Sequence, residues 1–178
     1  MLDLIHLEHK NISRLLALLE RKLAAIQAED EVDFRLIRDS VEYLGSYSEK
    51  YHHPKEDVIY LYYLEHYGDN GNIAKLDKEH EELSVLTEDF ETTVDMILMD
   101  AVVPLDVFAD QLQQFIRRQR DHLMFEERDV LPVIAKAFNE QDWLNVRERC
   151  ILEYDDPLFG REVSARFRRL SEKLFEQA

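Results

Sequence analysis

The chain has 178 residues and is poor in the residues that make turns and cross-links: four glycines, four prolines and one cysteine. So few glycines and prolines argue against a turn-rich β-sandwich. A single cysteine, Cys150, excludes an internal disulfide and argues against a thiolate metal site. Leu, Glu, Ala, Arg and Lys are plentiful instead, and these residues favour helices.

Long apolar runs and positive charge are scarce as well. No stretch approaches the roughly 20 apolar residues of a membrane helix. The first twelve residues, MLDLIHLEHKNI, carry charge and histidine where a signal peptide needs an apolar run. The formal net charge of −16 would repel nucleic acid and anionic membranes. We therefore expect a soluble, cytoplasmic protein that binds neither nucleic acid nor membrane.

Apolar residues recur at helical spacing along most of the chain. We expect four long helices, over residues 3–28, 32–67, 72–100 and 104–137. Asp33 is placed to cap the second helix, and Pro104 suits the first turn of the fourth. Because the connections are short, the sequence predicts an all-α fold in which residues 1–137 form an up-down-up-down four-helix bundle.

The remaining residues, 138–178, predict two additional C-terminal helices. These helices are expected over residues 139–153 and 161–176, separated by the break DDPLFG. No low-complexity linker precedes them, so we expect a single domain over residues 1–178, with 138–178 as a helical extension. The extension would pack on the bundle or on a second subunit, which would make the protein a homodimer.

The bundle region contains an internal repeat that aligns its histidines. EHKNISRL at 8–15 matches EHEELSVL at 79–86, and YHHPKEDV at 51–58 is echoed by DHLMFEERDV at 121–130. Each half therefore carries one histidine on its first helix and a His-x-x-x-Glu on its second. The aligned residues are His9, His52 and Glu56 in the first half, and His80, His122 and Glu126 in the second.

Helix geometry predicts that these residues meet. At about 1.5 Å rise per residue, His9 and His52 lie level in an antiparallel pair, and so do His80 and His122. Positions i and i+4 share a helix face, so each glutamate points the same way as its histidine. Six candidate ligands thus converge on one layer of the bundle.

The chemistry of this set predicts a metal centre. Four imidazoles and two carboxylates without a thiolate suit iron, manganese or zinc. Four histidines and two glutamates indicate two ions. Each ion would take two histidines, and the glutamates would bridge the two ions. Six protein groups shared by two ions leave coordination positions open, where a small ligand such as dioxygen could bind.

The His…His-x-x-x-Glu…His…His-x-x-x-Glu pattern, over roughly residues 1–137, resembles the bacterial hemerythrin-like domains of the HHE cation-binding family. The resemblance implies a non-haem di-iron protein whose bridging carboxylates are joined by an oxo or hydroxo group. It also implies the ligand assignment: iron on His9 and His52, iron on His80 and His122, and bridges from Glu56 and Glu126.

Two departures separate this sequence from the oxygen carriers that it resembles. The carriers have a second histidine on the third helix, whereas Leu76, Leu83 and Ser84 stand at the neighbouring positions of His80 here. Their last carboxylate is an aspartate five residues after its histidine, whereas Glu126 follows by four. Because of these two departures, the pattern indicates the family more firmly than it indicates oxygen transport. Bacterial members of the family are also implicated in oxygen sensing, iron handling and responses to nitric oxide or peroxide.

The expected function is therefore binding of dioxygen, or of another small diatomic or peroxide ligand, at the di-iron site. The alternatives are an iron-binding, iron-sensing or metal-storage protein of the same fold, and a di-iron oxidase. No catalytic acid, base or nucleophile stands out apart from the metal site. A binding or sensing protein is thus expected rather than an enzyme.

Three further residues with metal-binding side chains lie close to the six candidate ligands in the sequence. His6 lies one turn before His9 and could supply a fifth imidazole. His53 is rotated by about 100° from His52 on an α-helix, which indicates a polar neighbour and not a ligand. Glu49 shares the face of His52 and is a candidate for an outer position.

The residues next to the two glutamates predict local features. Asp57 and Glu127 are expected to face solvent as salt-bridge partners. Pro54 removes a backbone donor and should bend the helix or open a local bulge.

Overall fold

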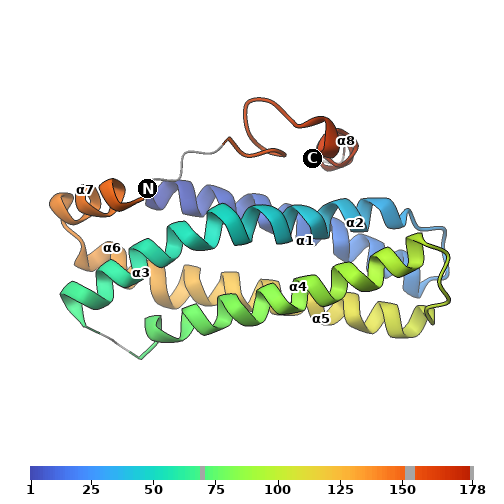
Figure 1. Cartoon of the computed structure of the whole chain (residues 1–178), viewed down its shortest axis with the longest axis horizontal. Coiled ribbons are helices and arrows are strands. Elements are labelled where there is room, and N and C mark those ends of the chain that lie inside the picture. Colours follow the sequence, from blue (N-terminus) through green and yellow to red (C-terminus); the bar gives the residue numbers. More distant parts are fainter. Residues whose placement is uncertain (69–70, 151–154, 177–178) are drawn as a thin grey trace.

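The structure of the chain, a computed structural model, describes residues 1–68, 71–150 and 155–176; the side chain of Glu49 is not described. All regular elements among these residues are helical, as expected (Figure 1). They are α1 (Leu2–Gln27), α2 (Phe34–Tyr43), η1 (Leu44–His52), α3 (His53–Tyr67), η2 (Ile73–Lys75), α4 (Leu76–Leu98), α5 (Leu105–Phe125), η3 (Glu126–Val130), α6 (Leu131–Ala137), α7 (Glu140–Arg149), η4 (Ala165–Phe167) and α8 (Arg168–Phe175).

The four long helices expected from the sequence are present, and two of them contain a π-helical segment. α1 is the first and η2 with α4 the third, while α2–η1–α3 and α5–η3–α6 form the second and fourth. Asp33 caps α2 as predicted, because its carboxylate accepts a hydrogen bond from the backbone nitrogen of Arg35. Pro104 lies one residue before α5 and serves as its N-cap.

Each π-helical segment ends just before a proline. The nitrogen of His53 donates to the carbonyl of Ser48 before Pro54, and the nitrogen of Leu131 donates to that of Glu126 before Pro132. Proline lacks the N–H that an α-helix needs and its ring clashes with the carbonyl four residues earlier, so the preceding turn widens. The bulge expected at Pro54 is therefore confirmed.

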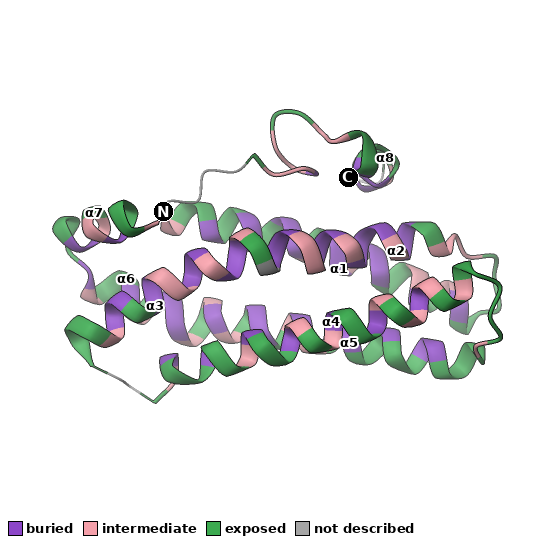
Figure 2. Cartoon of the chain, viewed as in Figure 1, coloured by how far each residue is buried: buried purple, intermediate pink, exposed green. Residues whose placement is uncertain are grey.

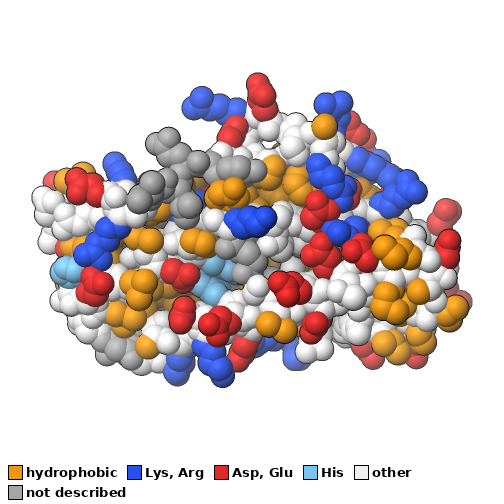
Figure 3. All heavy atoms as spheres, viewed as in Figure 1, with side chains coloured by type: hydrophobic (Ala, Val, Ile, Leu, Met, Phe, Trp, Pro, Cys, Tyr) orange, Lys and Arg blue, Asp and Glu red, His pale blue; other side chains and the backbone are white. Residues whose placement is uncertain are grey.

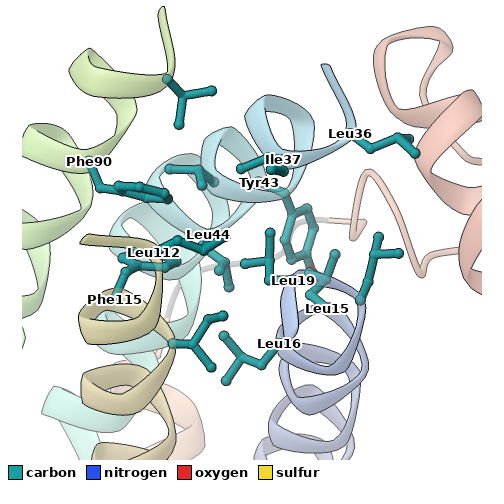
Figure 4. Close-up of a cluster of buried hydrophobic side chains, with 14 of the residues drawn as sticks. Leu15, Leu16, Leu19, Leu36, Ile37, Tyr43, Leu44, Phe90, Leu112 and Phe115 are labelled. Carbon is teal, nitrogen blue, oxygen red and sulfur yellow. The ribbon is translucent and has the colours of Figure 1, made fainter. Parts of the chain in front are cut away.

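The long helices lie side by side along the molecule and bury their inward faces (Figures 1 and 2). α1 packs against α5, and α4 packs against both α2 and α5. The interior contains two hydrophobic clusters. The larger cluster includes the residues labelled in Figure 4: Leu15, Leu16, Leu19, Leu36, Ile37, Tyr43, Leu44, Phe90, Leu112 and Phe115.

The candidate ligands mark the boundary between these two clusters. Along α1, Ile5 belongs to the smaller cluster and Ile12 to the larger, and His9 stands between them. Likewise, His122 and Glu126 separate Phe115 from Val130 on the fourth long helix. A buried polar layer thus crosses the bundle between two apolar blocks, and the blocks hold the helices in register.

The C-terminal extension is less helical than expected. α7 ends at Arg149, and residues 151–153 of the predicted helix lie outside the described ranges. The helix predicted from residue 161 begins only at η4, because the chain before it forms a turn. There the Asp156 carboxylate accepts hydrogen bonds from the nitrogens of Leu158 and Phe159, and the nitrogen of Ser164 donates to the carbonyl of Pro157.

The extension packs on the bundle of the same chain. α7 contacts α3, and α8 contacts α1 and α2. Arg166 pairs with Asp39 at 2.6 Å and also with Glu42, and the Tyr43 hydroxyl donates to Asp156 at 2.8 Å. Pairing with a second subunit through these helices stays a prediction. Among the described residues, no helix is long and apolar enough to cross a membrane.

Candidate metal centre

All six candidate ligands are buried and meet at the polar layer. His9 comes from α1, His80 from α4 and His122 from the end of α5. The rest come from the bulged parts of the second and fourth helices: His52 ends η1, Glu56 lies in the first turn of α3, and Glu126 begins η3.

The Nε2 atoms of the four histidines face the two carboxylates. Glu56 has His9 at 2.9 Å, His52 at 3.5 Å and His80 at 3.7 Å. Glu126 has His122 at 3.3 Å, His9 at 3.4 Å and His80 at 3.6 Å. Each carboxylate thus faces imidazoles from both halves of the repeat. The Tyr60 hydroxyl donates to Glu126 at 2.8 Å and orients it further.

The opposite nitrogen of each histidine, Nδ1, lies against a second carboxylate. The pairs are His9 with Glu127 at 2.7 Å, His52 with Glu8 at 2.9 Å, His80 with Asp57 at 3.0 Å and His122 with Glu79 at 3.3 Å. A carboxylate accepts a hydrogen bond, so Nδ1 carries the proton and the Nε2 lone pair is left for a metal. This arrangement also fixes the orientation of each ring.

The outer carboxylates follow the internal repeat. Glu8 and Glu79 each precede a candidate ligand histidine, and Asp57 and Glu127 each follow a candidate bridging glutamate. Asp57 and Glu127 are partly exposed ion-pair partners, as expected, and the imidazole that each one pairs with is a candidate ligand on another helix. The repeated acid beside each ligand was the sequence signal that could have identified all four.

His53 also belongs to the buried group. Its ring stacks on that of His80 with centroids 4.1 Å apart and planes 6° apart. Ligand-type atoms of His53, Glu56, His80 and His122 all lie within 4.8 Å of one another, and the same holds for His9, His52 and Glu56. The expectation that His53 is a polar neighbour and not a ligand therefore did not anticipate its place in this buried cluster, at the junction of η1 and α3.

The other two candidates have different positions. His6 is 42 % exposed, and its Nδ1 contacts Glu127 at 2.9 Å instead of facing the centre. It therefore supports the carboxylate that holds His9. The side chain of Glu49 lies outside the described part of the chain.

The electrostatics of the centre favour a bound cation. Burial lowers the pKa of His9, but the hydrogen bond with Glu56 and nearby carboxylate charges outweigh it and raise the pKa to about 9. Burial likewise opposes protonation of His80, but the hydrogen bond with Asp57 and the nearby carboxylates of Glu126 and Glu56 raise its pKa to about 10. Positive charge is thus stabilised among these carboxylates, and a metal ion would replace the protons.

The pKa values of three other groups at the centre shift in different directions. Burial lowers the pKa of His52 well below its usual value, with further lowering from neighbouring histidines. Burial and the charge of Glu126 raise the pKa of Glu56. Burial opposes ionisation of Glu126 too, but His122 and His80 lower its pKa to about 2. One carboxylate of the pair is therefore held firmly ionised by imidazoles.

Several buried atoms of the centre have no hydrogen-bond partner among the residues that the structure describes. They are Nε2 of His52, His80 and His122, and Oε2 of Glu56 and Glu126. An unsatisfied buried polar atom costs about 1–3 kcal/mol, so a group of them is unfavourable unless a ligand satisfies it. Nitrogen and oxygen donors without sulfur suit a first-row divalent cation. These residues therefore fit a metal centre.

Apolar side chains shield the centre on one side, and a hollow approaches it on another. Ile12, Leu16, Leu83 and Phe115, which lie within a turn or two of the candidate ligands along their helices, are buried. A hollow of about 530 Å³ lies between α3 and α4 and is lined by Pro54, Ser84, Val85, His53, His80, Asp57, Asp77, Glu81 and Glu88. Histidine atoms are visible among acidic side chains near the middle of the face in Figure 3.

Comparison with known proteins agrees with this chemistry. The model of the family described as hemerythrin HHE cation binding domain matches residues 1–134. Searches of curated proteins and of solved structures found no significant match. The matched region contains all the buried histidines and glutamates of the centre. The chain therefore belongs to the hemerythrin HHE cation-binding domain family.

Proposed function

We propose that this chain holds two iron ions in a carboxylate-bridged centre, at the middle of an up-down-up-down four-helix bundle, and that the centre binds dioxygen or a related small ligand. The observation that carries the proposal is the convergence of four imidazole Nε2 atoms on two buried carboxylates. Four outer carboxylates hold the opposite nitrogens and support the same reading.

The two metal positions of the proposed centre are unequal. His9 and His52 would hold one ion, and His53, His80 and His122 the other, with Glu56 and Glu126 as bridges. This proposal differs from the division into two and two that the sequence suggested by adding His53 to the second ion. The ion with two imidazoles keeps more open coordination positions, so the small ligand is expected to bind there.

Iron, when bound, supplies reversible electron exchange with such a ligand, while the protein residues supply shape and charge. Buried apolar neighbours such as Ile12 and Phe115 keep water away from the centre. Manganese and zinc suit the same donors, so the donor types alone do not select iron. Iron is proposed because the sequence resembles the di-iron hemerythrin-like domains.

A second candidate function is iron sensing, in which occupancy of the centre is itself the signal. The hollow beside His53 and His80 favours it, because two proposed ligands of one ion border a space of about 530 Å³. An ion at that position could exchange with solvent more readily than an ion enclosed by the apolar blocks. A di-iron oxidase, the third candidate, would require this hollow to admit the substrate.

The visible absorption spectrum tests these functions. The protein is loaded anaerobically with ferrous iron, exposed to oxygen, and then returned to anaerobic conditions. A charge-transfer band that appears with oxygen and fades on its removal supports the oxygen-binding site. Rapid irreversible oxidation favours sensing, storage or an oxidase, and no iron uptake would remove the metal proposal altogether.

The ligand assignment has its own test. His52→Ala and Glu126→Ala should each sharply lower the iron content measured by elemental analysis, while circular dichroism shows that the helices remain. The matched control is His66→Ala, because His66 stacks on Tyr62 outside the centre. Full metal loading in either of the first two variants would contradict the assignment.

A further inference from the structure

A separate cavity of about 650 Å³ lies beside the metal centre, where the C-terminal segment passes over α1 (Figure 1). Its walls come from α1, from the η1–α3 region and from the loop before η4. The lining residues that matter are Leu4, Leu7 and Phe159, which are apolar, and Glu8, Asn11, Tyr47, Lys55, Asp155, Asp156 and Arg161, which are polar. This volume lies within the range of small-molecule sites.

The acids in the lining are already engaged by donors of the protein. Glu8 accepts from Tyr47 at 3.0 Å, from the Nδ1 of His52 at 2.9 Å and from Lys55. Asp156 accepts from the Tyr43 hydroxyl and from two backbone nitrogens of its own loop. Asp155 accepts from the backbone nitrogen of Arg161. Glu8 and Asp156 therefore leave little capacity to bind a cationic ligand, and Asp155 is exposed to solvent.

The unused capacity in the lining belongs to donors. Lys55 is buried and carries three N–H donors, and its one hydrogen-bond acceptor among the described residues is Glu8. In the same part of the chain, neither the Asn11 amide nitrogen nor the Arg161 guanidinium has an acceptor. Spare donors beside Leu4, Leu7 and Phe159 suit a molecule that joins an anionic head to an apolar body.

We propose that this cavity binds a small monocarboxylate with an apolar body, and that the metal centre senses its occupancy through Glu8. The carboxylate is received by Lys55, Asn11 and Arg161, and the body lies against the apolar wall. The link to the centre rests on the proposed metal function, whereas the binding site itself does not.

Glu8 differs from the other three outer carboxylates in a way that makes it a suitable link. Its side chain is 4 % exposed, whereas those of Asp57, Glu79 and Glu127 are 35–38 % exposed. Solvent therefore screens Glu8 least, and its charge is balanced by Lys55. A ligand carboxylate that pairs with the Lys55 ammonium weakens the pairing of Lys55 with Glu8. The negative charge of Glu8 is then less compensated, which makes the imidazole of His52 a stronger metal donor.

Linkage makes this coupling reciprocal: a carboxylate in the cavity favours metal binding, and bound metal favours the carboxylate to the same degree. Isothermal titration calorimetry measures both sides on the full chain, using octanoate as the probe and zinc as a metal without redox chemistry. Octylamine and octanol carry the same body without the anionic head, and inorganic phosphate is an anion without the body.

We expect octanoate to bind metal-free protein at least about tenfold more tightly than octylamine, octanol or phosphate. Arg161→Ala and Asn11→Leu should each weaken octanoate about tenfold, whereas Arg118→Ala, beside a different hollow, leaves it unchanged. Lys55 is not substituted, because its loss would leave the buried Glu8 carboxylate without its counter-charge. Failure of octanoate to bind, equal binding of octylamine, or unchanged binding in both variants would overturn the cavity site.

The link to the centre is tested separately. Zinc-loaded protein should bind octanoate more tightly than metal-free protein, and Glu8→Gln should abolish that difference while zinc still binds. Equal octanoate affinity with and without zinc would refute the link and leave the cavity site standing. A chain that takes up no zinc or iron but binds octanoate would refute the metal function, and with it the link, and would leave the cavity site intact.

Discussion

Removal of the metal should destabilise this protein strongly, because the centre buries polar atoms that lack hydrogen-bond partners within the described part of the chain. Five such atoms lie in the centre, three on histidines and two on the glutamates: His52, His80, His122, Glu56 and Glu126. Each costs about 1–3 kcal/mol when unsatisfied. Without an ion, the polar layer therefore weakens the junction between the two hydrophobic clusters.

The size of the effect follows from binding linkage. An ion present at about a thousand times its Kd stabilises the folded state by about 4 kcal/mol, so two ions contribute about 8 kcal/mol. For a chain of 178 residues, each kcal/mol shifts Tm by about 2–4 °C. We therefore expect Tm of the loaded protein to exceed that of the chelated protein by about 15–30 °C.

The assay is thermal unfolding followed by circular dichroism, with ferrous iron under anaerobic conditions or with zinc, and with a chelator in the parallel sample. Glu126→Ala is the control, because it removes a proposed bridge and should lose most of the metal-dependent shift. A Tm that differs by less than about 3 °C between loaded and chelated wild-type protein would refute the reasoning.

Three further predictions concern the same centre. Because the pKa values of His9 and His80 rise to about 9 and about 10 on folding, from 6.5, their protonation stabilises the metal-free protein fully below about pH 6.5. The free energy of unfolding from urea titrations should therefore fall between pH 7 and pH 10.5; a constant or rising value would contradict this. His53→Ala should reduce the metal content from two ions toward one in elemental analysis, whereas undiminished content would show that His53 is no ligand. Asp57→Asn should weaken metal affinity about 10- to 100-fold in a chelator competition, unlike Asp77→Asn in the same hollow, because only Asp57 holds His80. Equal affinities in the two aspartate variants would argue against a role for the outer carboxylates.

The sequence alone determined the helical class, most helix boundaries and the six residues that meet at the centre. Hydrophobic periodicity is a local property, and the internal repeat brought His9, His52, His80 and His122 to matching depths without reference to the fold. The cap at Asp33 and the bulge before Pro54 were also predictable, because each depends only on neighbouring residues.

Only the tertiary structure decided which groups surround these residues. The pairing of Glu8 with His52 and of Asp57 with His80 crosses between helices, so it depends on helix rotation and register. His53 joins the group through contacts with other helices, such as the stacking of its ring on that of His80. Residues 161–164 are not helical because side-chain and backbone contacts of the preceding turn outweigh local propensity. Local periodicity selects the residues, but packing sets the angles at which they face each other.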